Sequence, residues 1–199
     1  MASTRSTGND LQRAILDEAR RVLEEQGYGA LSTRRIASAV GCTATSIYLY
    51  FQSKDALVHA LIDEGFEELN RRVLEATGGP GAPHERLRAA ARAYVDFGLE
   101  RPAYYEIMFM LRAEQMERYP AEAYRRARRS LEAFCELTGH TPEDALKHGT
   151  IVWATLHGLV SLLIARRVDV SLDESALVRD AIETACAGAL EGSPTTKDA

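Results

Sequence analysis

Apolar residues along the first part of the chain recur at the spacing of an amphipathic helix. The first such segment places four of them on one helical face: Leu11, Ile15, Ala19 and Leu23. Asn9 or Asp10 can cap the start of this helix, and the glycines at 27 and 29 are expected to end it.

The same reasoning predicts eight further helices, separated by caps, prolines and glycines. They are expected over about residues 33–40, 43–51, 54–76, 84–100, 102–111, 120–139, 142–167 and 173–192. The strongest internal break is TGGPGAP (77–83), and the polar tail SPTTKDA closes the chain. Because no segment alternates convincingly between apolar and polar residues, we expect an all-α fold of about nine helices and no sheet.

Composition adds limits on the class of protein. Apolar residues make up 46% of the 199 residues, enough for a substantial core, and no apolar run approaches the length of a membrane span. The N-terminus has no apolar stretch that could serve as a secretory signal. Cys42, Cys135 and Cys186 show neither disulfide nor metal-ligand spacing, so a reducing cytoplasm is the expected setting.

The net charge of −5 is unevenly distributed. Through Lys54 there are seven Lys+Arg and five Asp+Glu, so this head carries +2 and the remainder carries −7. A basic head on an acidic body is compatible with a nucleic-acid partner for the head alone.

Three positions between the second and third predicted helices have the spacing of a helix-turn-helix. Ala37 offers a small side chain where the two helices cross, Gly41 accepts a positive φ in the turn, and Ile47 anchors the second helix in the core. The spacing alone also fits a tight helical hairpin with no DNA role.

The surrounding segment, LSTRRIASAVGCTATSIYLYFQSKDAL (31–57), resembles the DNA-binding head of the tetracycline-repressor (TetR) family of bacterial regulators. The matching features are Ser32 as cap, Ile36-Ala37, Gly41, Ile47-Tyr48, an aromatic residue at 50, Phe51, Lys54 and Leu57. Tyr50 stands where many relatives have histidine, and Cys42 where valine is usual. The resemblance covers about the first 70 residues. It implies a head at 1–54 with the helix-turn-helix at about 33–52, an effector-binding and dimerisation body at 55–199, and a connecting helix at 54–76.

The resemblance also implies that the third helix enters the major groove of double-stranded operator DNA. Small side chains at its start allow close approach to base edges, and hydroxyl groups can hydrogen-bond to bases. The residues assigned to DNA are Thr33, Arg34, Thr43, Ala44, Thr45, Ser46, Tyr48, Tyr50 and Lys54. Arg34 is assigned either to guanine or to phosphate, and Lys54 to phosphate. Phe51 is expected in the core, and Arg5, on a loose N-terminal arm, is a further candidate for the minor groove.

Two segments of the body, RPAYYEIMF (101–109) and WATLHGLVSLL (153–163), resemble a subgroup of this family that often has tryptophan directly before a His-Gly pair. Here Leu156 takes that place and Trp153 lies one turn earlier. The helices at 142–167 and 173–190 carry extensive apolar surface, which either forms an internal core or pairs with a second copy as a four-helix bundle. The interface candidates are Leu156, Leu159, Leu163, Val178, Ile182, Ala185 and Ala189.

Aromatic and methionine side chains gather between residues 94 and 116, and a further group lies near 153. Such side chains form either core or the adaptable wall of a cavity for a small, largely apolar effector. The candidates for this effector pocket are Tyr94, Phe97, Tyr105, Met108, Phe109, Met116, Trp153 and His157.

The expected function is a transcriptional repressor that acts as a homodimer and leaves an inverted-repeat operator when the effector binds. An activator of the same architecture remains an alternative, as does an all-helical small-molecule-binding protein or enzyme. The sequence contains no Gly-rich phosphate loop, HExxH, Cys/His metal spacing or nucleophile motif. Neither enzymatic activity nor a cofactor or metal is therefore expected.

Overall fold

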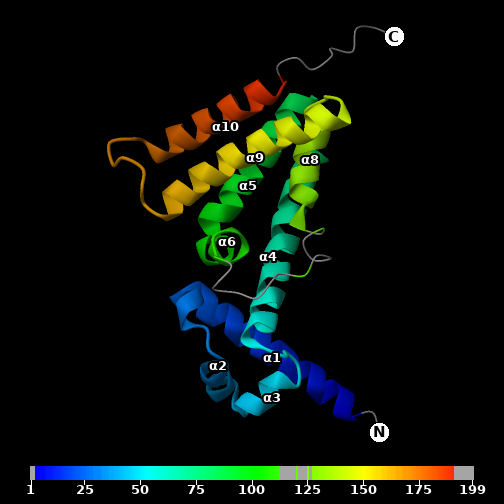
Figure 1. Cartoon of the computed structure of the whole chain (residues 1–199), viewed down its shortest axis with the longest axis vertical. Coiled ribbons are helices and arrows are strands. Elements are labelled where there is room, and N and C mark those ends of the chain that lie inside the picture. Colours follow the sequence, from blue (N-terminus) through cyan, green and yellow to red (C-terminus); the bar gives the residue numbers. More distant parts are fainter. Residues whose placement is uncertain (1–2, 113–119, 121–124, 126, 191–199) are drawn as a thin grey trace. The chain divides into compact units, whose positions relative to one another are not determined.

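The computed structural model of the chain describes residues 3–112, 120, 125 and 127–190 (Figure 1). Within them the chain forms nine α-helices, one short 3-10 helix and no strand, which confirms the all-α prediction. The described residues of Met1–Phe66 and Ala103–Pro120 form one compact unit, and those of Glu67–Pro102 and Ala121–Ala199 form a second. Helix α4 (Lys54–Thr77) contributes its first half to the first unit and its second half to the second. The expected functional division at residue 54 stays a prediction.

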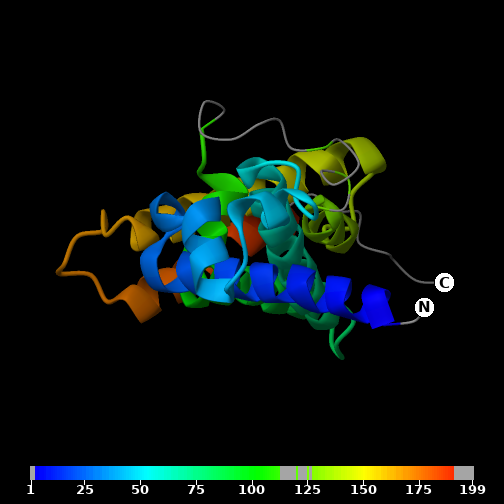
Figure 2. The ribbon, with the colours of Figure 1, turned by 90° about the horizontal axis from the view of Figure 1, so that it is seen from below.

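The first unit begins with a small helical cluster. Helix α1 (Ser3–Gln26) packs against α2 (Thr33–Val40), which packs against α3 (Ala44–Tyr48). Figure 2 shows these three helices from below, with α1 in blue. The 3-10 helix η1 (Tyr28–Ala30) connects α1 to α2. Of the four residues predicted for the inner face of α1, Ile15, Ala19 and Leu23 are fully buried and Leu11 is half-buried.

The helix-turn-helix geometry is present as predicted. Gly41 adopts a left-handed conformation with φ 77°, and the next backbone N–H, that of Cys42, donates to the carbonyl of Ala37 at 2.9 Å. Ala37 and Ile47 are both buried, at 3% and 0% exposure. A side chain at position 41 would be strained at that φ, so glycine fixes the angle between α2 and α3.

Two predicted helix ends in this unit are wrong. Helix α1 begins at Ser3 rather than near Asn9, so Arg5 lies within a helix and not on a loose arm. A helix interior tolerates Gly8 at a cost of about 1 kcal/mol, and nothing else before Asn9 breaks it. Helix α3 ends at Tyr48 instead of 51, because the backbone N–H groups of Leu49 and Tyr50 donate three residues back, to Ser46 and Ile47, in a tightened last turn, and the Phe51 ring enters the core.

Helix α6 (Pro102–Phe109) crosses the first half of α4 in the first unit. The crossing is close, since a Cβ placed on Gly65 would lie 2.5 Å from Sδ of Met108. The rings of Phe66 and Phe109 pack edge to face beside it, with centroids 5.4 Å apart. Glycine at position 65 therefore sets how near α6 can lie to α4.

One polar cluster joins three helices of this unit. Arg20 of α1 donates from Nε and Nη2 to the two carboxylate oxygens of Glu64 on α4, at 3.2 and 2.9 Å. The hydroxyl of Tyr104 on α6 donates to the same carboxylate at 3.1 Å. Burial raises the pKa of Tyr104, and the adjacent Glu64 carboxylate raises it further, so the phenol stays a donor. We call these three residues the Glu64 cluster.

The second unit is a bundle of longer helices. Helices α5 (Pro83–Glu100), α8 (Arg129–Leu137), α9 (Pro142–Ile164) and α10 (Glu174–Leu190) pack around one core, with α9 against each of the other three. The largest buried side chains of this core are Tyr94, Phe97 and Phe134. The buried amide of Asn70 on α4 accepts from the backbone N–H and the hydroxyl of Ser130, at 3.0 and 2.6 Å, and so caps the start of α8.

Helix α9 is shorter than predicted, and the helix predicted before it lies partly outside the described residues. Residues 121–124 and 126 of the expected 120–139 helix lie outside the described residues, and the described α8 covers Arg129–Leu137. Helix α9 stops at Ile164 instead of 167, because Arg166 takes φ 51° and Arg167 donates back to the carbonyl of Leu162 at 2.9 Å. This is a left-handed helix end formed without glycine.

The contact of α8 with α9 generates a stability prediction. A Cβ on Gly149 would lie 2.5 Å from Sγ of Cys135 and 3.0 Å from its backbone nitrogen. We expect Gly149→Ala to lower the free energy of unfolding by about 1–3 kcal/mol through overpacking, measured by urea denaturation. Adding Cys135→Ala should recover only part of the loss, because the backbone contact remains. An unchanged unfolding midpoint in Gly149→Ala would contradict this account of the crossing.

Candidate DNA-binding surface and effector site

Helix α3 presents one exposed face. Thr45, Tyr48 and Leu49 follow one another at helical spacing, with Tyr48 at 49% and Leu49 at 78% exposure. Ile47, on the opposite side, is fully buried, and Phe51 is in the core as predicted. One narrow face of the short helix α3, formed by Thr45, Tyr48 and the adjoining Leu49, is therefore exposed to solvent.

The start of α3 is fixed by its own hydroxyl groups. The side chain of Thr43 accepts from the backbone N–H of Ser46 at 3.1 Å, and the two hydroxyl oxygens are 2.8 Å apart. Thr43 is therefore the N-cap of α3, and its DNA role stays a prediction. Ala44 is half-buried beside it.

The two helices of the motif meet at their outer edge. The hydroxyl oxygens of Thr33, at the start of α2, and Tyr48, at the end of α3, are 3.4 Å apart. Arg34 is exposed next to Thr33, and Arg35 is exposed beyond it. The predicted residues on α2 and α3 therefore form one continuous surface that offers hydroxyl groups and cations.

The remaining two predicted DNA residues are partly engaged inside the first unit. Nζ of Lys54 lies 4.5 Å from the centre of the Tyr28 ring, a cation–π distance. The phenol oxygen of Tyr50 lies against α1, 3.6 Å from where a Cβ of Gly8 would be. Both side chains are half-buried, so each has a packing role besides any contact with phosphate.

The candidate effector residues fall into two groups. Tyr105, Met108 and Phe109 belong to α6 in the first unit, where Tyr105 is fully buried and its ring centroid lies 4.8 Å from that of Phe109. Tyr94, Phe97, Trp153 and His157 belong to the second unit, where Phe97 is fully buried in the core. Met116 lies outside the described residues.

Three of the second group make a polar-aromatic stack. The indole N–H of Trp153 donates to the hydroxyl oxygen of Tyr94 at 3.1 Å, and the His157 ring stacks on the indole with centroids 5.4 Å apart. Burial lowers the pKa of His157, which favours the neutral imidazole at neutral pH. A neutral imidazole beside an indole suits an apolar ligand with one hydrogen-bonding group better than a charged imidazolium would.

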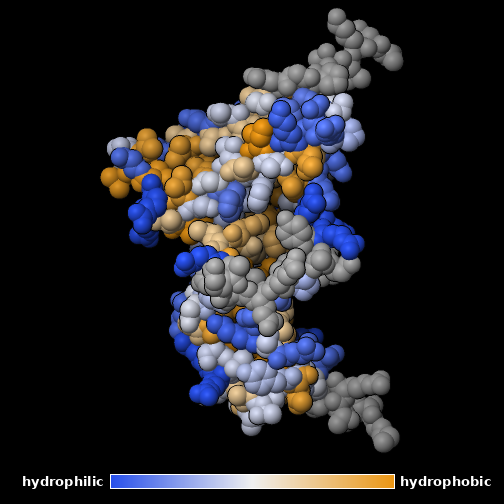
Figure 3. All heavy atoms as spheres, in the orientation of Figure 1, coloured by the Kyte–Doolittle hydropathy of each residue, from blue (hydrophilic) through white to orange (hydrophobic). Residues whose placement is uncertain are grey.

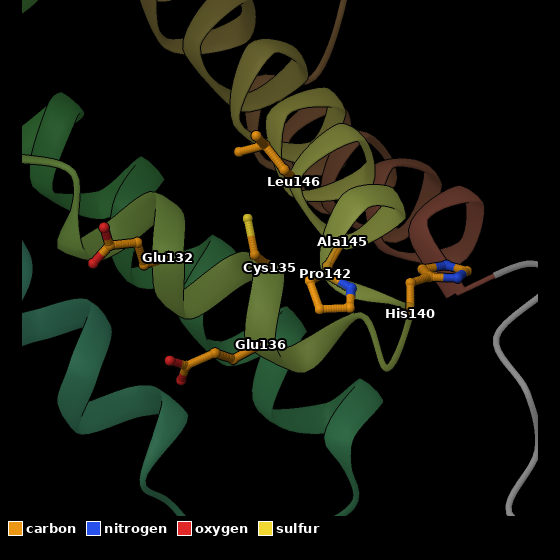
Figure 4. A pocket seen from close by; sticks show the side chains of 7 residues that line it. All are labelled: Glu132, Cys135, Glu136, His140, Pro142, Ala145 and Leu146. Atoms are coloured by element: carbon orange, nitrogen blue, oxygen red, sulfur yellow. The ribbon is translucent and has the colours of Figure 1, made fainter.

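A separate groove lies between α8 and α9, with a volume of about 410 Å³ (Figure 4). No effector candidate lines it; its wall consists of Glu132, Cys135, Glu136, His140, Pro142, Ala145 and Leu146. Burial raises the pKa of Cys135, so its thiol stays protonated and is a poor nucleophile. Among the described residues no group of three or more His, Cys, Asp or Glu side chains could hold a metal ion.

Most of the interface candidates are buried within the single chain, and their role in an interface stays a prediction. Leu156 is fully buried, and exposure is 8% or less at Leu159, Val178, Ile182, Ala185 and Ala189, because these side chains form the core between α5, α9 and α10. They leave little surface for a second chain, and of the seven only Leu163 is half-buried. The apolar side chains that α9 does expose are Leu146, Ile151 and Leu162, at 47%, 49% and 50%. Figure 3 shows apolar surface over the region of α9 and α10.

The sequence interpretation also missed Leu49. A helical projection of residues 44–49 would have placed it beside Thr45 and Tyr48, since those positions are four and one residues apart from it.

Comparison with known proteins agrees with this geometry. The family model described as "Bacterial regulatory proteins, tetR family" matches residues 15–61. The model described as "Tetracyclin repressor-like, C-terminal domain" matches residues 87–185. An HTH-type transcriptional repressor of Mycobacterium tuberculosis is 41% identical over 58 residues, which are 29% of this chain and 31% of that protein. The chain thus matches about a third of this curated relative's length.

Solved structures share the fold over nearly the whole chain. The regulatory protein SCO4313 superposes with a TM-score of 0.79 at 20% identity, covering 91% of this chain and 97% of that one. AibR, solved in complex with isovaleryl coenzyme A and operator DNA, has a TM-score of 0.61 at 20% identity, covering 87% and 97%. At these identities the likeness shows the fold alone.

No described helix is long and apolar enough to cross a membrane. With a helix-turn-helix in place, an all-helical second unit and family matches to both parts, the chain belongs to the TetR family of DNA-binding transcriptional regulators.

Proposed function

We propose that this protein is a cytoplasmic repressor that binds an inverted-repeat operator as a homodimer and leaves it when a small, largely apolar effector binds. The observation that carries the proposal is the exposed face of α3, on a helix whose angle to α2 is fixed by Gly41 and whose inner side is anchored by Ile47. The Mycobacterium relative is named a repressor, and AibR was solved with both operator DNA and a ligand, isovaleryl coenzyme A, which supports a chain that binds both DNA and a small molecule.

In this proposal the reading surface is small. The hydroxyls of Thr33, Thr45 and Tyr48 donate to or accept from bases and phosphates, and Arg34 adds one cation. Lys54 holds a phosphate from the start of α4, where backbone N–H groups also point outward. One such surface is too little for specific affinity among genomic competitors, so two must act together.

The exposed side of α9 supports pairing of two copies. Ile151 and Leu162 lie half in solvent on that helix, and between them a Cβ on Gly158 would meet no atom within 4 Å. On α10 the space around Gly188 is equally open. Helix-interior glycines cost about 1 kcal/mol each relative to alanine, and close approach of a partner helix offsets that cost. We therefore propose this face of α9 and α10, rather than their buried residues, as the dimer interface.

The proposed function predicts a two-fold symmetric binding site. DNA selected from random sequence by the purified protein should contain an inverted repeat. Its half-sites should be about one or more helical turns apart, because an isologous dimer presents two α3 helices related by a two-fold axis. Selection of DNA without any shared sequence would contradict the proposal.

Leu162→Glu tests the dimer within the same experiment, because it places a charge in the proposed interface. We expect monomers by sedimentation at micromolar concentration and loss of operator binding, with the helical circular dichroism spectrum retained. Leu74→Glu is the matched control, since Leu74 is similarly exposed, at 41%, but lies on α4. Wild-type operator affinity in a monomeric Leu162→Glu protein would refute the paired architecture.

The proposed effector binds against the stack of Trp153, Tyr94 and His157. The partly buried indole offers apolar ring surface and is held by its hydrogen bond to the buried Tyr94, and the partly buried imidazole offers one polar group. Release of DNA then requires that the effector bind the DNA-free arrangement more tightly than the DNA-bound one.

The effector proposal can be read out directly, because Trp153 is the only tryptophan of the chain. In a screen of small, largely apolar compounds, those that change its fluorescence should also weaken operator binding. Operator DNA should weaken binding of such a compound by the same factor, as linkage requires. We expect His157→Asn to weaken compound binding while leaving operator affinity unchanged in the absence of compound. Compounds that bind near Trp153 without any effect on operator affinity would show a site with no regulatory role.

A further inference from the structure

Among the described residues of the first unit, Leu49 is the most exposed large apolar side chain. So exposed a side chain has little packing role within the unit. Leu49 is 78% exposed and is the C-cap residue that directly follows α3, whereas Ile47 within α3 is 0% exposed. A leucine with most of its surface in solvent contributes little to the stability of the fold. Its position, next to Tyr48 and one turn after Thr45, places it on the face of α3 described above.

The chemistry of leucine restricts what it can do on that face. It has no side-chain donor or acceptor, so unlike Tyr48 it cannot hydrogen-bond a phosphate or a base edge. In the major groove the base edges offer hydrogen-bonding groups, and thymine adds an apolar C5-methyl group. A side chain that can only make apolar contacts therefore matches one base.

We propose that Leu49 is a specificity-determining residue that contacts the C5-methyl group of a thymine in each operator half-site. This inference deepens the proposed function and rests on it, because it requires α3 to lie in the major groove. The neighbouring hydroxyls position α3 on the duplex, and Leu49 selects thymine over the other bases at one position.

The exposed leucine has a simpler explanation, since single apolar residues occur commonly on protein surfaces. The two explanations differ in what DNA chemistry they predict. A contact with the methyl group depends on that methyl group alone, whereas a surface leucine without a DNA role is indifferent to it. A contact with sugar or phosphate would likewise be indifferent to the methyl group.

The experiment compares thymine with deoxyuridine, which lacks only the C5-methyl group. Operators obtained by selection are synthesised with deoxyuridine at one symmetric pair of thymines at a time, and Kd is measured for wild type and Leu49→Ala. For the wild type, deoxyuridine at one symmetric pair of thymines should weaken binding by about fourfold per half-site, or about fifteenfold for both half-sites. This is the factor for losing the burial of one methyl-sized group.

In Leu49→Ala that sensitivity should disappear at the same pair while sensitivity at other thymines remains. The thermal unfolding midpoint should match wild type. Leu74→Ala, which truncates a similarly exposed leucine on α4, is the control and should keep the wild-type pattern. Non-additivity between removal of the thymine methyl group and Leu49→Ala is the signature of a direct contact between the two groups.

Two results would overturn the proposal while leaving the proposed function intact. One is a Leu49→Ala protein that loses affinity equally for thymine and deoxyuridine operators, which would assign Leu49 to the DNA backbone. The other is a Leu49→Ala protein with wild-type affinity and wild-type thymine sensitivity. Failure of the wild-type protein to select any shared sequence would instead overturn the proposed function, and this inference with it.

Discussion

The charge-assisted hydrogen bonds around Glu64 are the interaction on which the arrangement of the first unit depends. Its carboxylate takes two N–H groups from Arg20 on α1 and one O–H from Tyr104 on α6. Hydrogen bonds to charged groups contribute about 1.5–3 kcal/mol, and removing one partner leaves a partly buried charge poorly compensated. Because α1 packs on α2 and α2 on α3, the cluster also bears on where the exposed face of α3 lies.

This cluster gives the proposed regulation a physical route. Helix α6 carries Tyr104 beside three effector candidates, Tyr105, Met108 and Phe109, and it crosses α4 at Gly65 with no room for a larger residue. A displacement of α6 therefore cannot be absorbed locally without disturbing Tyr104 or Met108. In the proposed mechanism, effector binding at the Trp153 stack favours another position of α6, which weakens the bond to Glu64, and the loss reaches α1 and then the reading surface. Coupling of this kind requires a two-state element, and α6 is the element proposed.

Much of the fold could be predicted from the sequence because local signals and core packing agree. Periodic apolar residues and Gly41 predicted helix boundaries that the structure has, and the side chains of Ser53 and Asp173 cap the helices that follow them. The ends that were mispredicted lack such signals: α9 ends on the left-handed Arg166, where sequence favours glycine, and α1 continues through Gly8. The interface candidates rested on apolar periodicity, which marks a buried face without saying whether the same chain or another covers it, and the structure buries six of the seven within the chain. The Glu64 cluster joins residues 20, 64 and 104, and no local pattern connects positions so far apart in sequence.

The most direct test of this account is a double-mutant cycle on operator affinity with Tyr104→Phe and Glu64→Gln. Neither residue lies on the exposed face of α3, so an effect on DNA must pass through the packing of α1, α4 and α6. Each single variant should weaken operator binding while remaining folded, and the double variant should be no worse than the weaker-binding single one. The resulting coupling energy should be about 0.5–3 kcal/mol. Wild-type operator affinity in both single variants, with the fold intact, would contradict the claim that this cluster positions the DNA-reading surface.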